Sequence, residues 1–228
     1  MSPVGPLLDH REWGRREYGE SLAEMRALRA QRRRGEIPDT LVLVEHPAVI
    51  TVGVQGRAGD VLPEGIPVFD VERGGKSTYH GPGQLVGYPI VDLSPRGRDV
   101  RRYVHDLEDV VIRALAEVSV PAGRVEGQRG VWVEGRRKIA SVGIAVAEWV
   151  AFHGFAVNVD TDLSVFRAFR PCGLSGEVMT SVSRERGVPT EVGELRGPIV
   201  QAWEAVFATP HSVVKPPLTA RRGAPAIP

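Results

Sequence analysis

The sequence has one cysteine, three lysines and no long hydrophobic run. A lone cysteine, Cys172, cannot form an internal disulfide, and it cannot build a structural zinc site by itself. No stretch of about 18 or more apolar residues is present, so no membrane-spanning helix is expected. Residues 1–11 also lack the basic-then-apolar layout of a secretion signal. We therefore expect a cytoplasmic protein that packing stabilises, and Cys172 needs another explanation.

The sequence also has no large excess of charge of either sign, because it contains 29 Lys and Arg residues and 28 Asp and Glu residues. This balance gives no general argument for nucleic acid or an anionic membrane as a partner. Five arginines nevertheless crowd the end of the first expected helix: Arg26, Arg29, Arg32, Arg33 and Arg34. They form either a solvated helix end or a surface for an acidic protein.

The scarcity of lysine draws attention to the three lysines that are present, Lys76, Lys138 and Lys215. Arginine keeps its proton in proteins, whereas a lysine amine can lose it, so a chemical base is a role that arginine cannot fill. The same scarcity also follows from drift in an arginine-rich genome. Composition alone leaves both explanations open.

The pattern along the chain predicts an α+β fold, with a mixed, mainly antiparallel sheet and flanking helices. Apolar periodicity predicts helices over 12–34, 100–118 and 190–208, and one helical turn over 162–166. β-Branched runs predict strands over 41–45, 49–52, 68–71, 84–93, 131–133, 138–146 and 150–159. The last three strands form an antiparallel meander. We expect residues 1–209 to be one domain and 210–228 to be a proline-rich tail.

Cys172 is a candidate nucleophile because Pro171 and Gly173 place it in a loop, with Arg170 nearby. The thiolate is the reactive form, so a neighbouring cation favours attack. Lys138, at the start of a predicted strand, is a candidate for that cation and for proton exchange. The alternatives are a buried, inert cysteine and a surface lysine. Sequence spacing does not decide between them.

Other motifs have both a structural and a functional interpretation. The segment 73–78 ends in Gly-Lys-Ser but lacks the first glycine of a phosphate loop and a following helix, so we reject that motif. The segment 78–84 is either an ordinary hairpin turn or a polar site built on glycines. Small residues over 141–143 and 153–156 either hold a slender acyl chain or allow close strand packing. His46, His80 and His153 lack metal-ligand spacing, so no metal is expected.

These motifs together resemble the lipoyl(octanoyl) transferase family over almost all of the expected domain. The resemblance is carried by Glu45-His46-Pro47 with Thr51 and Gly53, RGGKSTYHGPGQLVGYPIVDL from Arg73, KIASVG from Lys138, HGFAVNV from His153, and PCG around Cys172 with Thr180-Ser181. Residues 54–57 depart from the family pattern. The family resemblance implies a fold similar to the catalytic domain of biotin and lipoate protein ligases.

By this resemblance Cys172 is the nucleophile, and Lys138 is the partner that activates its thiol. The donor is octanoyl-acyl carrier protein, and the acceptor is a lysine of an apo lipoyl domain in a 2-oxo acid dehydrogenase complex or the glycine cleavage H protein. This is the first step of lipoate biosynthesis, and it needs no cofactor, ATP, nucleic acid or membrane. The substrate-binding residues implied are Arg73, Gly74, Gly75, Lys76, Ser77, Thr78, Tyr79, His80, Ser141, Val142, Gly143, Gly154, Phe155 and Ala156.

Two rival functions remain at this point. An ATP-dependent lipoate or biotin protein ligase of related fold needs no cysteine and uses the glycine-rich segment to hold an adenylate. A non-catalytic module binds nucleic acid through the arginines of residues 26–34, and salt-sensitive binding is its test.

Overall fold

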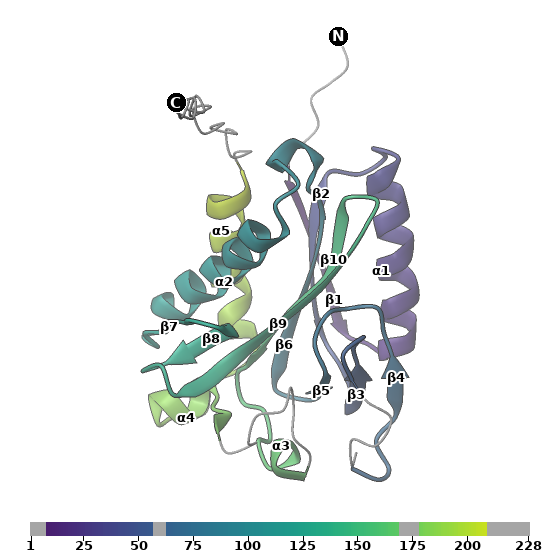
Figure 1. The fold of residues 1–228 in the computed structure, drawn as a ribbon. Coiled ribbons are helices and arrows are strands. Elements are labelled where there is room, and N and C mark those ends of the chain that lie inside the picture. The colour runs from purple at the N-terminus through teal and green to yellow at the C-terminus, as the bar shows by residue number, and fades with distance from the viewer. Residues whose placement is uncertain (1–7, 57–62, 169–177, 209–228) are drawn as a thin grey trace, which may run out of the picture.

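The computed structural model describes residues 8–56, 63–168 and 178–208, which form two sheets and their covering helices (Figure 1). The large sheet has the order β1 (Leu8–Arg15), β2 (Asp39–Glu45), β6 (Gln84–Asp92), β10 (Val150–Asn158), β9 (Arg137–Ala147), β8 (Gln128–Val133) and β7 (Gly123–Val125). The small sheet has the order β4 (Val68–Asp70), β3 (Val49–Val52) and β5 (Ser77–His80). The helices are α1 (Tyr18–Arg33), α2 (Val100–Glu117), α3 (Val165–Ala168), α4 (Val182–Arg186), α5 (Gly193–Phe207) and the 3-10 turn η1 (Ser94–Arg96).

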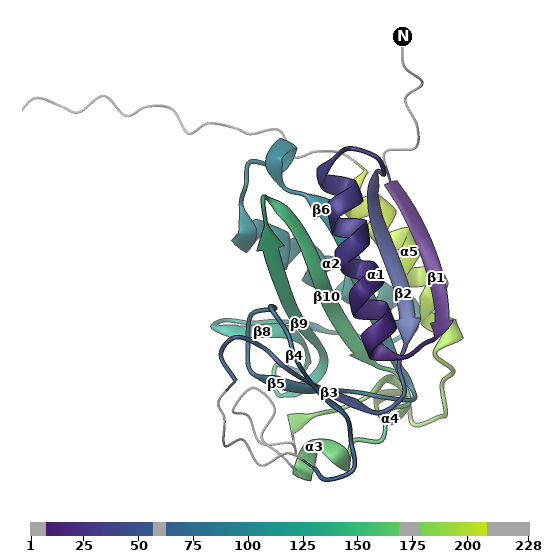
Figure 2. The same cartoon turned by 90° about the vertical axis from the view of Figure 1, so that its right-hand side faces the viewer.

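Helices cover both faces of the large sheet. Helix α1 packs against β6 and β10 on one face, and α2 and α5 pack together on the other (Figures 1 and 2). Strand β2 shows why the centre is buried on both sides. Leu41 and Leu43 join the core under α2 and α5, whereas Val42 and Val44 join the core under α1. A continuous apolar run is typical of a strand with both faces covered.

The predicted helix over 12–34 is wrong at its N-terminal end. Residues 8–15 form β1, which runs parallel to β2, and α1 begins only at Tyr18. Half-buried and exposed positions largely alternate along β1, as expected for an edge strand with one face on α5. Pairing with β2 satisfies backbone groups there, and this long-range interaction overrides the helical spacing of the apolar residues.

The α+β fold and the antiparallel meander are confirmed, because β8, β9 and β10 are neighbours in the large sheet. Strands β9 and β10 meet at a two-residue turn, Glu148-Trp149, in which both residues have positive φ. That geometry matches the twist of a tight hairpin. Strands β5 and β7 and helix α4, which are four, three and five residues long, were not predicted.

The small sheet positions the glycine-rich segment. Strand β3 pairs with β5, so residues 73–76 are held between two strand ends beside the large sheet. The residues that follow are β5, a strand rather than a helix, which agrees with the rejection of a phosphate loop. The loop expected around Cys172 and the tail expected over 210–228 lie outside the described residues.

In the part of the chain that the structure describes, no helix has the length and apolar character needed to cross a membrane.

Candidate active site

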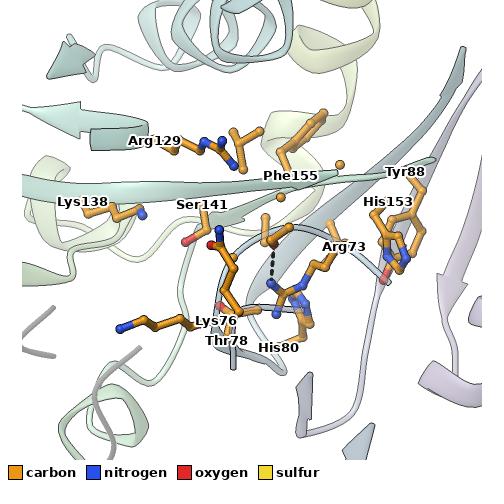
Figure 3. Close-up of a pocket in the computed structure, with 18 of the residues that line it drawn as sticks. Arg73, Lys76, Thr78, His80, Tyr88, Arg129, Lys138, Ser141, His153 and Phe155 are labelled. Atoms are coloured by element: carbon orange, nitrogen blue, oxygen red, sulfur yellow. Dashed lines mark hydrogen bonds between the residues drawn. The ribbon is translucent and has the colours of Figure 1, made fainter. Parts of the chain in front are cut away.

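A cavity of about 350 Å³ opens beside the large sheet, where the glycine-rich segment crosses it (Figure 3). Pockets of roughly 300–1,000 Å³ are typical of small-molecule sites. Its walls come from α1, residues 73–80, β6, β8, β9 and β10. The lining residues are Tyr18, Gln55, Arg73, Gly74, Gly75, Lys76, Thr78, His80, Val86, Tyr88, Gly127, Gln128, Arg129, Trp132, Lys138, Ser141, Val142, Gly143, His153, Gly154, Phe155 and Ala156.

The three segments implied by the family resemblance meet in this cavity, although they are up to 83 positions apart (156 − 73) in the sequence. All of the implied residues line it except Ser77 and Tyr79. Both belong to β5, whose side chains alternate between two faces. Tyr79 instead packs edge-on against Phe166, with ring centroids 5.6 Å apart.

Lys138 reaches the same cavity from β9 and is only 6% exposed. Its ammonium lies 5.5 Å from the centroid of the Trp132 ring, a cation–π contact with the neighbouring strand. The pairing of β8 with β9 shifts register between Val131 and Trp132. The irregular pairing lies directly beside Lys138, which faces Trp132 across the two strands.

Gly130 makes room for the Lys138 side chain. Its φ is +105°, and a Cβ there would lie 2.8 Å from Lys138 Cε and 2.4 Å from the Ala140 carbonyl oxygen. The Gly130 N–H donates to Glu108 Oε1 at 2.9 Å, and Arg124 Nε donates to Glu108 Oε2 at 2.9 Å. A buried carboxylate on α2 therefore fixes the backbone against which Lys138 lies.

Cys172 lies outside the described residues, so the structure does not place the second member of the candidate pair. The chain that follows it is held close to Lys138. Met179 forms a parallel bridge with Lys138, and the Thr180 N–H donates to the Lys138 carbonyl at 2.9 Å. Seven residues (179 − 172) span at most about 25 Å, so connectivity limits how far Cys172 can be from the Lys138 backbone.

Arg73 is buried in the cavity wall and ties the glycine-rich segment to β3. Its guanidinium donates to the Thr51 carbonyl and to Thr51 Oγ1, both at 2.8 Å, and to the Gly74 carbonyl at 3.0 Å. Gly53 permits this approach, because a Cβ there would lie 2.5 Å from the Gly75 carbonyl oxygen. The Gly74 N–H donates to the Ile144 carbonyl at 2.8 Å and fastens the segment to β9.

A buried polar network continues from the cavity into the protein. His80 Nδ1 lies 2.7 Å from Gln84 Oε1, Gln84 Nε2 donates to Asn158 Oδ1 at 2.9 Å, and Asn158 Nδ2 donates to the Thr180 carbonyl at 3.0 Å. The chain thus links His80 to the residue that bonds the Lys138 backbone. The network ties the cavity wall to the segment that follows Cys172 in the chain.

The interior of the cavity carries neutral imidazoles near neutral pH. Burial lowers the pKa of His80 to about 3 and that of His153 to about 4, although Glu72 acts to raise the latter. Burial also raises the pKa of Tyr18 and of Tyr88. His153 has a φ of +58°, which is strained for a residue with a side chain.

Several lining residues were missed by sequence reasoning: Tyr18, Gln55, Val86, Tyr88, Gly127, Gln128, Arg129, Trp132 and, as a lining residue, His153. Alternation along β6 could have found Val86 and Tyr88 together, since they share a face two residues apart. No local signal marks Tyr18 or Arg129. Among the described residues, no group of three His, Cys, Asp or Glu side chains could hold a metal ion.

We predict that the His80 and His153 rings stay neutral as the pH falls from about 8 to about 5, because burial disfavours their charged forms. An unfolded histidine titrates near 6.5, so below that pH the unfolded state binds more protons and stability falls. The loss is at most about 1.4 kcal/mol per pH unit for each ring. Ring signals in NMR spectra, assigned with His80→Gln, check this, and titration of either ring near 6.5 would contradict it.

Comparison with known proteins adds to this geometry. Residues 17–204 match the lipoyl protein ligase A/B catalytic domain family. An octanoyltransferase of Geobacter metallireducens is 45% identical over 186 residues, which are 82% of this chain and 87% of that protein. An octanoyltransferase of Mycobacterium tuberculosis is 44% identical over 197 residues, 86% of this chain and 85% of that protein.

Solved structures support the fold. A protein of Thermoplasma acidophilum with bound lipoic acid aligns with a TM-score of 0.72 at 18% identity, covering 88% of this chain and 86% of that one. A lipoate-protein ligase A bound with ATP aligns with a TM-score of 0.69 at 17% identity, covering 88% and 85%. These identities bear on the fold alone, whereas the family match over residues 17–204 includes every residue that lines the cavity. The chain belongs to the lipoyl protein ligase A/B catalytic domain family.

Proposed function

We propose that this protein is an octanoyltransferase, which moves an octanoyl group from octanoyl-acyl carrier protein to a lysine of an apo lipoyl domain. The observation that carries the proposal is the convergence of Lys138 with the segments 73–80, 141–143 and 154–156 in one cavity. Relatives named octanoyltransferase, 44–45% identical over most of their length, supply the substrate class.

The proposed chemistry uses two thioesters in succession. The Cys172 thiolate attacks the carbonyl of the donor thioester, a new carbon–sulfur bond forms, and the carrier thiol departs. The acceptor amine then attacks the acyl-enzyme, an amide forms, and the Cys172 thiolate is released. The Lys138 ammonium stabilises the Cys172 thiolate and gives a proton to the departing carrier sulfur. As a neutral amine it then takes a proton from the attacking acceptor amine, which restores the ammonium beside the released thiolate. Because a thioester is already activated, no ATP or other cofactor is required.

The cavity walls suit an octanoyl group. Val86, Val142, Phe155 and Ala156 offer apolar surface to an alkyl chain, while the neutral histidines add no charge to those of Arg73 and Lys138.

We propose that residues 1–209 form one catalytic domain followed by a proline-rich tail. We also propose that the reaction takes place in the cytoplasm, where thiols stay reduced. The acceptor domains belong to 2-oxo acid dehydrogenase complexes and the glycine cleavage H protein.

The ATP-dependent ligase is the less supported alternative. Lipoate protein ligase structures share the fold at 17–18% identity, whereas the relatives of higher identity are named octanoyltransferases. A ligase also leaves Cys172 without a role. Activity that requires ATP and survives loss of the thiol would favour it.

The structure also weakens the case for a nucleic-acid-binding module, which rested on the arginines of residues 26–34. The five clustered arginines each pair with a carboxylate, so their charges are largely compensated within the protein. The pairs are Arg26 with Glu72, Arg29 and Arg33 with Glu148, Arg32 with Asp39, and Arg34 with Glu36.

We predict that Cys172→Ser loses nearly all transfer from octanoyl-carrier protein, because a serine hydroxyl is far less ionised than a thiol. Intact mass spectrometry of the wild-type protein mixed with octanoyl-carrier protein should show one added octanoyl group, and peptide mapping should place it on Cys172. The Ser variant should not gain this group from the thioester donor. An unimpaired variant, or an octanoyl group mapped elsewhere, overturns the acyl-enzyme.

We predict that Lys138→Arg loses transfer activity, although arginine keeps the positive charge, because the side chain at this position must also exchange protons. A fall in kcat of roughly 100-fold or more is expected. Lys215→Arg, the same substitution in the proline-rich tail, is the matched control and should transfer at the wild-type rate. Wild-type turnover in Lys138→Arg would refute the base role.

We predict that Gly130→Ala lowers transfer by roughly 100-fold, because the new Cβ displaces the Lys138 side chain and the φ of +105° suits glycine. Gly123→Ala in β7 is the control, since a Cβ there meets nothing within 4 Å. Kinetics are compared at equal folded fraction, measured by circular dichroism. Full activity in a folded Gly130→Ala protein would contradict the role of this glycine.

A further inference from the structure

The floor of the cavity is made of small residues on two neighbouring strands and ends at a large side chain on a third. Between β9 and β10, Ser141 pairs with Ala156 and Gly143 pairs with Gly154, and all four residues line the cavity. Strand β6 pairs with the other edge of β10 and contributes Tyr88 to the lining. The room left by the small residues therefore ends at a tyrosine ring.

The reacting end of the cavity lies opposite Tyr88. Figure 3 shows Lys138 and Tyr88 at the two ends of the lining, with Arg73 and Phe155 between them. Lys138 lies on β9 and Tyr88 on β6, and β10 separates these strands, so two inter-strand spacings, or about 10 Å, lie between them. With its carbonyl beside Lys138, an acyl chain crosses these strands, and its last carbons reach the Tyr88 end.

The Tyr88 ring is held from behind by a buried histidine. The Tyr88 hydroxyl lies 2.8 Å from His46 Nε2, and His46 Nδ1 lies 2.7 Å from the Arg16 carbonyl oxygen. Burial lowers the pKa of His46, which favours the neutral ring with one N–H. Because a carbonyl can only accept, His46 Nδ1 donates to Arg16, and the Tyr88 hydroxyl donates to Nε2. The hydroxyl hydrogen is therefore already bonded to the protein.

Tyr18 of α1 supports this arrangement from the helix side. Its ring packs edge-on against His46, with centroids 5.3 Å apart, and stacks on His80, with centroids 6.2 Å apart. Tyr18, His46 and Tyr88 are each at most 3% exposed. Closely packed buried rings move only at a cost in packing, so this end of the cavity resists a chain that is too long.

The two buried cations of the lining leave this end to the rings. The Arg73 guanidinium donates to Thr51 and to the Gly74 carbonyl, which are oxygens of the protein itself. Lys138 lies at the opposite end, where the reaction takes place (Figure 3). The terminal carbons of an acyl chain therefore meet aromatic carbon at the Tyr88 end.

We propose that Tyr88 sets the upper limit on the length of the acyl chain, with His46 holding its ring in place and Tyr18 packed behind His46. This inference rests on the proposed function. A longer chain must either displace these rings or move its carbonyl away from Lys138. One methylene group in a pocket of fixed shape changes kcat/KM by about 10- to 200-fold.

Carrier proteins loaded with hexanoyl, octanoyl, decanoyl and dodecanoyl groups test the proposal on the full-length protein. The measurement is kcat/KM for each chain, at equal folded fraction by circular dichroism. The wild-type protein should use decanoyl and dodecanoyl at least about tenfold less well than octanoyl. Tyr88→Leu should move the optimum to decanoyl or dodecanoyl, because loss of the ring lengthens the cavity. Tyr88→Met, which also removes the ring, serves the same purpose if Tyr88→Leu does not fold.

Two controls separate ring volume from other effects. Tyr88→Phe keeps the ring and loses only the hydroxyl, so octanoyl should remain its optimum. Tyr103→Leu is the matched substitution, because Tyr103 is also a buried tyrosine, its hydroxyl donates to the Pro89 carbonyl at 3.3 Å, and it does not line the cavity. This variant should keep the wild-type order of chain lengths.

Each other result overturns the proposal. An unchanged optimum in a folded Tyr88→Leu or Tyr88→Met protein shows that another group limits the chain, as does a wild-type protein that uses dodecanoyl as well as octanoyl. A shift of the optimum in Tyr103→Leu or Tyr88→Phe shows that ring volume at position 88 is not the cause. Equal loss on all four donors in Tyr88→Leu shows a general role in the fold. Failure of the proposed function is distinct, because no loaded carrier then acylates the wild-type protein.

Discussion

The cavity depends on the buried guanidinium of Arg73. A buried charge is costly unless hydrogen bonds compensate it, and this one donates to Thr51 and to Gly74. Those bonds join the small sheet to the glycine-rich segment and so hold one wall of the cavity above β9. Arg73 lines the cavity, yet its charge is directed largely into the protein's own backbone. Arg73 therefore has mainly a structural role. It holds in place the segment that contributes Lys76 and Thr78 to the cavity lining.

Glycines make the same wall possible from the other side. Gly53 allows the Gly75 carbonyl to approach, and Gly130 allows Lys138 to lie along β8. In both places an added Cβ would overlap an atom that is already there: the Gly75 carbonyl oxygen at Gly53, and Cε of Lys138 at Gly130. The buried carboxylate of Glu108 then holds Gly130 in position from α2, on the opposite face of the sheet. The position of Lys138 is thus determined by a helix that contributes nothing to the cavity lining.

The sequence predicted the fold class, the central strands and the three segments that meet in the cavity. It did so because the apolar runs of β2, β6 and β10 agree with strands that are buried on both faces, and because the family motifs are specific. It failed at β1, where long-range pairing with β2 overrides helical spacing. It also missed Tyr18, Trp132 and Arg129, since each reaches the cavity through packing between distant elements. The strained φ of His153 has no sequence signal.

The charged and titratable side chains of the cavity bear on which acyl donor the fold can use. An adenylate brings its anion directly next to the acyl group, whereas a carrier-bound thioester places neutral amides between the acyl group and the phosphate. In this chain the interior histidines are neutral, and Arg73 is engaged by backbone oxygens. The Arg73 charge is therefore directed into the protein and not toward an anion beside the acyl group. That arrangement fits the proposed thioester donor better than an adenylate.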